Sequence, residues 1–306
     1  MLPRLLCLLL LTVNTGAAEV VRAGRWDLHS SFWMNLHQTL LHDAAAKTSN
    51  DRAVLSVAER EAWQTAVAAY RSAARDSSVE LQDELTQVAD DAMKIEATGP
   101  LADALRQAAP VYRAHWWAAD DAANRFVIGY ASAMLREAGE ELVRAHEAVY
   151  GEPFPESIRV DLAAFAGPFG AFSISSDYGR PVATVASRDP GNHGLHALEV
   201  ILHESSHSVV SPGEGRVARA IAAASKKAGR QPPRDLWHAV LFGTTSELTR
   251  RALAARGVTD YEPQARELFT RAWPHYREAI ETHWYAYLAG SGTLEDAIEK
   301  IVAAVK

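Results

Sequence analysis

A short group of strand-like segments interrupts a sequence that is otherwise typical of helices, and this interruption limits the folds open to the chain. Apolar residues recur at helical spacing over about 31–150, and helical patterns return from about residue 195. Between these two parts, 157–162, 170–174 and 182–187 are short alternating or aromatic runs bounded by Gly and Pro, as expected for strands. The sequence therefore predicts a mainly α fold with a small central β-sheet, of the α+β class.

Residues that favour helix starts suggest where several of the front helices begin. Ser56 with Glu59, and Ser77 with Glu80, each have the spacing of a capping box, in which a serine and a glutamate satisfy the first backbone N–H groups of a helix. Pro110 suits the first turn of a further helix. We therefore expect helices to begin near these three positions.

The first residues have the pattern of an export signal. Arg4 is followed by the apolar run 5–13 and then by small residues up to Ala18, which is the arrangement of a secretory signal peptide. A membrane anchor is the alternative, but the run is shorter than the roughly 20 apolar residues that span a bilayer. We expect cleavage after Ala18 and an exported protein, periplasmic or secreted. Because the single cysteine, Cys7, leaves with this segment, a metal site would use His, Asp or Glu.

The length of the chain limits its domain organisation, and its charge limits its binding partners. The 306 residues divide into a signal peptide (1–18), an N-terminal helical region (19–155) and a C-terminal region (156–306), and the last two can form one compact unit. With 31 Lys and Arg against 38 Asp and Glu, the chain has no electrostatic attraction to nucleic acid or to anionic lipid. We expect no nucleic-acid partner and a protein that is not embedded in a membrane.

The residues that carry chemistry are His203, Glu204 and His207. Two histidines four positions apart lie on one face of a helix, so both imidazoles can reach a single zinc ion. Glu204 projects beside them, where it can accept a proton from water. The neighbouring positions Ser205 and Ser206 are uncharged, as a buried helix requires. The alternative is a helix that carries two surface histidines.

This string resembles the H-E-x-x-H signature of zincin metallopeptidases. Metzincins continue with a Gly and a third His, but those positions hold Val210 and Gly213 here. The chain is therefore more similar to gluzincins, in which a Glu on a later helix is the third zinc ligand. The resemblance covers the motif helix and the chain after it. It implies a zincin-like catalytic part, one zinc per chain, a peptide or protein substrate, and Glu204 as the general base of peptide-bond hydrolysis.

The third ligand is the least determined part of this assignment. The candidate acids are Glu214, Glu247, Glu262 and Glu267. Glu247 is preferred because it lies in an apolar segment beyond a full intervening helix, and a buried carboxylate needs a charged partner such as zinc. The hydroxyl-rich stretch 244–246 just before it could supply hydrogen bonds to the ligand. Two alternatives stay open: Glu247 pairs with Arg250 or Arg251, or His238 is the ligand instead.

A zinc peptidase also needs a donor for the oxyanion that develops on the attacked carbonyl. His238 is the first candidate, because a bend at Gly243 could bring it beside Glu247; the others are Tyr178, and then His283 and Tyr285. A rival function of a different class is an exported helical binding or scaffold protein with a vestigial or structural zinc site. The presence of Glu204 favours catalysis, since a structural zinc site does not need a base.

Overall fold

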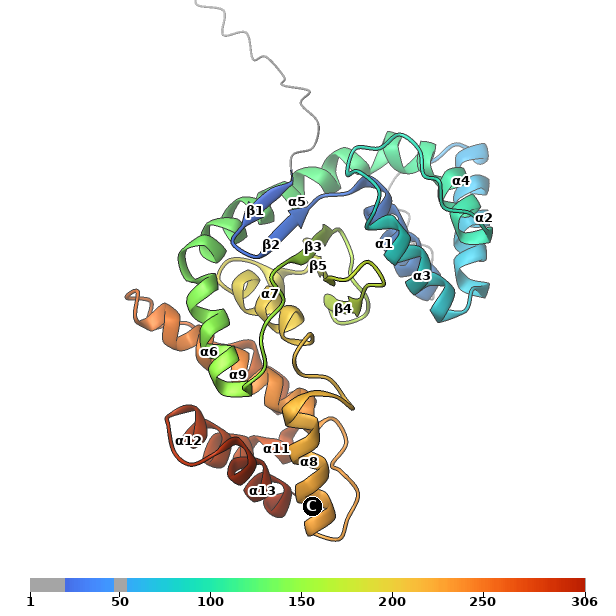
Figure 1. Cartoon of the computed structure of the whole chain (residues 1–306). Coiled ribbons are helices and arrows are strands. Elements are labelled where there is room, and N and C mark those ends of the chain that lie inside the picture. Colours follow the sequence, from blue (N-terminus) through green and yellow to red (C-terminus); the bar gives the residue numbers. More distant parts are fainter. Residues whose placement is uncertain (1–19, 47–53, 306) are drawn as a thin grey trace, which may run out of the picture.

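The computed structural model describes residues 20–46 and 54–305, so the predicted signal peptide lies outside the described residues. Of the described residues, 61% are helical and 9% lie in strands, which confirms a mainly α fold with a small sheet (Figure 1). Within the described ranges, no helix combines the length and the apolar character that crossing a membrane requires.

The sheet has five strands in the order β1-β2-β3-β5-β4. The strands are β1 (Val21–Ala23), β2 (Trp26–His29), β3 (Ile158–Ala163), β4 (Ala171–Ser175) and β5 (Pro181–Ala186). β2, β3 and β5 run parallel, whereas β1 and β4 pair antiparallel at the two edges. Every residue of β3 is buried, as expected for a parallel strand that is covered on both faces. The three strands predicted from the sequence correspond to β3, β4 and β5.

The sequence did not predict β1 and β2, which lie in the region assigned to helices. β2 pairs with β3 in register from Trp26 opposite Ile158 to His29 opposite Asp161. A strand of four residues gives only a weak pattern, and its partner lies more than a hundred residues later in the chain. Their pairing joins the N-terminal region to the central sheet.

Four helices follow the first hairpin and form their own hydrophobic core: α1 (Phe32–Ala45), α2 (Val57–Ser72), α3 (Arg75–Leu85) and α4 (Pro100–His115). The capping box of Ser56 and Glu59 is confirmed at the start of α2. A helix begins close to Ser77, because α3 starts at Arg75, but its N-cap is Ala74 and the predicted capping box is absent from it. The third predicted start is wrong, since Pro110 lies inside α4. Gly99 ends the preceding loop with φ 97°, and Pro100 takes the first helical position instead.

A second and larger core joins the sheet to the remaining helices. These are α5 (Trp117–Met134), the π-helix η1 (Leu135–Gly139), α6 (Glu140–Tyr150), the 3₁₀-helix η2 (Pro190–Asn192), α7 (His196–Ser206), α8 (Gly215–Lys227), α9 (Leu236–Ala254), α10 (Gln264–Arg271), α11 (Pro274–Ala279), the π-helix η3 (Ile280–Trp284), α12 (Tyr285–Leu288) and α13 (Leu294–Ala304). Because α5 and α6 pack in this core, the two cores divide near residue 117. Figure 1 shows α1–α4 at one end of the molecule and α8 and α11–α13 at the other.

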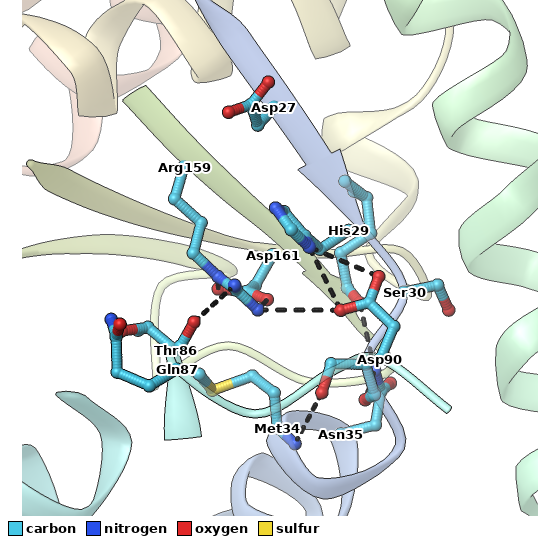
Figure 2. A network of polar contacts seen from close by, with 12 residues as sticks. Asp27, His29, Ser30, Met34, Asn35, Thr86, Gln87, Asp90, Arg159 and Asp161 are labelled. Atoms are coloured by element: carbon cyan, nitrogen blue, oxygen red, sulfur yellow. Dashed lines mark hydrogen bonds and ion pairs between the residues drawn. The ribbon is translucent and has the colours of Figure 1, made fainter. Parts of the chain in front are cut away.

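A buried polar network connects the segment of helices α1–α4, the front helices, to the sheet (Figure 2). Arg159 on β3 is 2% exposed; it makes two bonds of 2.8 Å to the Asp161 carboxylate and donates to the Thr86 carbonyl at 2.8 Å. Asp90 lies 3.7 Å from the Arg159 guanidinium and 3.0 Å from His29 Nδ1. Burial acts to lower the pKa of Arg159, but the charges of Asp161 and Asp90 outweigh it and raise the pKa. Arg159 is therefore charged and fully paired.

We expect Arg159→Met to destabilise the protein by about 3 kcal/mol, because it leaves the Asp161 and Asp90 carboxylates buried without a counter-charge. Urea unfolding measures the change. The control is Arg277→Ala on α11, which breaks an exposed pair with Glu281 of η3 and should cost less than about 1 kcal/mol. Equal losses in the two variants would contradict the role of Arg159.

Candidate metal centre

The helix that carries the H-E-x-x-H string, α7, is fixed by polar contacts at its buried positions. The Trp26 indole of β2 donates to Ser205 Oγ at 2.9 Å. The Ser205 and Ser206 hydroxyls donate back to the carbonyls of Ile201 and Leu202 at 2.6 and 2.7 Å. Both serines are fully buried, which explains why these positions are small and uncharged. α7 packs against β4, β5 and α9.

A carboxylate one turn before the first histidine also holds α7 in place. Glu199 is 1% exposed and accepts hydrogen bonds from the hydroxyls of Ser246 and Tyr261 and, at 3.2 Å, from the Gln264 backbone N–H. Burial raises its pKa, and these hydrogen bonds act in the opposite direction. Glu199 therefore connects α7 to α9 and to the start of α10. The hydroxyl of Ser246, expected to support Glu247, serves Glu199 instead.

The start of α9 places a third histidine beside the motif. Asp235 has φ 60°, in the left-handed region that few residues other than glycine adopt. Its carbonyl accepts the backbone N–H groups of His238 and Ala239, both at 3.0 Å, and so closes the first helical turn. His238 lies in that turn, on the helix that packs against α7.

His203, His207 and His238 come together as one group whose candidate ligand nitrogens all lie within 4.8 Å of one another. The Nε2 atoms of His203 and His238 are 3.2 Å apart. Two nitrogens that bind one tetrahedral zinc at about 2.1 Å would lie about 3.4 Å apart. The spacing of this pair therefore fits a shared metal ion.

All three imidazoles are held in the neutral form, which is the form that binds a metal. Burial lowers the pKa of His203 well below its ordinary value, and the charges of His207 and His238 act in the same direction. Burial lowers the pKa of His207 to about 4, although a hydrogen bond to the Val210 backbone acts to raise it. Burial and the charge of His207 lower the pKa of His238 to about 3.

Glu204 supplies a buried carboxylate beside this group. It is 5% exposed, and burial raises its pKa to about 8 despite a hydrogen bond with Ser173 on β4. Its Oε2 lies 3.9 Å from His207 Nε2 and has no hydrogen-bond partner among the described residues. A cation held by the three imidazoles would stabilise this charge, so the residues present fit a zinc ion.

The structure does not support the prediction that Glu247 is the third ligand, because it places His238 and not Glu247 with His203 and His207. Its Oε2 accepts from Arg250 Nε at 2.7 Å, and its Oε1 accepts from Arg250 Nη2 at 2.8 Å and from Arg251 Nε at 2.7 Å. Burial acts to raise the pKa of Glu247, but the two arginines outweigh it and lower the pKa. The carboxylate is therefore already neutralised by arginine, which is one of the two alternatives that the sequence left open. The resemblance to gluzincins rested on Glu247 as a ligand, so it is no longer supported. The resemblance of the H-E-x-x-H string to zincins does not depend on Glu247.

The continuity of α9 explains this correction. A bend between Gly243 and Ser246 would be needed to bring His238 beside Glu247, but α9 is an unbroken helix from Leu236 to Ala254. On such a helix the nine-residue offset between His238 and Glu247 corresponds to about two and a half turns, so the two side chains lie on opposite faces. His238 therefore joins the candidate metal ligands rather than standing apart as an oxyanion donor, and Glu247 does not.

The other candidates lie elsewhere. Glu214, Glu262 and Glu267 are exposed. Tyr178 is 53% exposed in the turn between β4 and β5. His283 lines a cavity of about 240 Å³ between η3 and α13, and Tyr285 lies beside Gly243.

The structure adds three aromatic neighbours that no sequence pattern singled out: Trp237, Phe242 and Trp273. The Trp237 ring stacks on His238 with centroids 4.7 Å apart, and the Phe242 ring lies 3.7 Å from His203. Phe242 follows His238 by four residues, a helical spacing that could have been recognised in the sequence. Trp273 follows α10, and no local pattern links it to the histidines.

A search of protein-family models, of curated proteins and of solved structures finds no match to this chain.

Proposed function

We propose that this protein is an exported zinc-dependent hydrolase, and specifically a peptidase, in which His203, His207 and His238 hold the metal. The observation that carries the proposal is the group of three neutral imidazoles with a buried carboxylate at its side. The signal-like first segment supports export. A metal held only for structure would gain nothing from a base at Glu204, and a structural site is usually closed by a fourth protein ligand.

Each side chain has its own part in the proposed reaction. The three histidines would hold zinc through neutral nitrogens, and three protein ligands are the usual number at a catalytic zinc. When bound, zinc supplies Lewis-acid chemistry, which polarises a carbonyl and acidifies water. Glu204 takes a proton from water at its Oε2 and later delivers it to the leaving nitrogen. Ser173 orients the Glu204 carboxylate from β4.

The protein purified without chelator should contain about one zinc per chain by metal analysis, because three histidines on two packed helices form a preorganised site. A variant that removes an exposed histidine outside the group, His275→Ala, should have the same zinc content as the wild type. A chain that carries no zinc and takes up none on titration would contradict the proposal.

Hydrolysis of a mixed peptide pool by the zinc-loaded protein tests the enzymatic half of the proposal, with mass spectrometry of the products. We expect cleavage that stops when a chelator removes the metal and returns when zinc is added. Zinc binding without any cleavage would favour the rival function, a binding or scaffold protein with a structural zinc.

A further inference from the structure

Three half-buried aromatic side chains contact the three histidines, and we call Trp237, Phe242 and Trp273 the aromatic collar. Trp237 and Phe242 belong to α9, whereas Trp273 comes from the segment before α11. The collar thus combines two separate parts of the chain around one group of imidazoles.

Each imidazole is in contact with the collar. Besides stacking on His238, Trp237 meets the His207 ring edge-on with centroids 5.6 Å apart. Phe242 packs on His203 and lies 5.0 Å from His238. Trp273 contacts His238 at 5.2 Å and Phe242 at 5.6 Å, both between ring centroids. Within the described part of the chain, the ring partners of the collar are therefore the candidate ligands and one another.

The partial exposure of the collar separates it from ordinary core packing. The large aromatic residues of the main core, such as Trp26, Tyr150 and Trp284, are completely buried. Trp237, Phe242 and Trp273 are only partly buried, and their rings contact the imidazoles of the candidate ligands. Trp273 is flanked by the exposed residues Ala272 and Pro274, yet its ring turns inward to His238.

The chemistry of the collar selects one kind of ligand. Aromatic surface next to the metal site favours an apolar group, because binding removes apolar area of both partners from water. A ring gains further from edge-to-face or offset contacts with Trp and Phe rings. The collar itself carries no charge, so a charged group there would lose its hydration without a counter-charge from these three residues.

We propose that the collar is a specificity subsite that receives an aromatic side chain of the substrate next to the carbonyl that is attacked. This inference rests on the proposed zinc site. It assigns Trp273 as a specificity-determining residue and names the substrate class as peptides with Phe, Tyr or Trp beside the cleaved bond.

Binding of two hydroxamates to the zinc-loaded full chain tests the subsite independently of hydrolysis. Acetohydroxamate and benzohydroxamate chelate zinc through the same group, and only the second carries a ring. We expect calorimetry to give at least about tenfold tighter binding of benzohydroxamate. In Trp273→Ala this preference should fall below about threefold, while the zinc content stays at one per chain.

Two further variants keep the test decisive. Trp117→Ala removes a half-buried tryptophan that packs on Phe32 in the front helices, and it should keep the full preference. Trp273→Leu retains an apolar side chain, so it folds more readily than the alanine variant and should give an intermediate preference. Equal affinity of the wild type for the two hydroxamates, or an unchanged preference in both Trp273 variants, would overturn the subsite and leave the zinc site intact. A chain that binds no zinc would overturn both proposals.

Discussion

Glu204→Gln should lower kcat for peptide hydrolysis by about 100- to 10,000-fold, the range that a positioned general acid–base group contributes. The amide has nearly the same shape as the carboxylate but cannot take a proton from water. Zinc content should remain at one per chain, because the three ligand nitrogens come from His203, His207 and His238. Steady-state kinetics and metal analysis on the same preparation measure both quantities.

The control for this experiment is Glu267→Gln, which changes an exposed carboxylate on α10 and should leave kcat unaltered. Glu204→Gln that hydrolyses peptides at the wild-type rate would remove Glu204 from the mechanism. Loss of zinc from Glu204→Gln would instead assign this carboxylate to the metal.

His238→Ala should weaken zinc binding by at least about 1000-fold, whereas Glu247→Ala should change it by less than about threefold. The loss of one of three ligands should lower the zinc affinity by more than the 10- to 100-fold that is typical when a residue that only orients a ligand is removed. Glu247 has no such effect because its carboxylate is bound to Arg250 and Arg251. Competition with a chromogenic chelator gives both affinities.

The comparison distinguishes the two assignments of the third ligand directly. Removal of Glu247 leaves Arg250 and Arg251 without their partner, so Glu247→Ala should lower the unfolding midpoint in urea even though zinc binding persists. If Glu247→Ala loses zinc as strongly as His238→Ala, the ligand set of three histidines is wrong.

Local signals in the sequence were sufficient for part of the fold and part of the site. The alternating runs that became β3, β4 and β5 and the capping box at Ser56 are patterns within a few residues, and each was recognised. His203, Glu204 and His207 are likewise close in sequence, so helical periodicity alone places them on one turn.

Features that depend on tertiary contacts were not predictable in the same way. Strand β2 is defined by its pairing with β3, and the position of Trp273 is defined by its contact with His238. Choosing between His238 and Glu247 required knowing whether α9 bends at Gly243. Since glycine is only weakly unfavourable inside a helix, the sequence left both outcomes open.

The hydrogen bond between Trp26 and Ser205 has a consequence for the order in which the molecule assembles. Trp26 is synthesised long before its neighbours on β3 and α7. Strand β2, which contains Trp26, therefore remains unpaired with β3 until more than half of the chain has been synthesised. Contacts between such distant segments make folding slow. The front helices α1–α4 have their own core within the first 116 residues, so they can form while the rest is still being made. The turn that carries His203 and His207 is therefore expected to become ordered late, and a chain released early would carry these histidines on an unsupported helix.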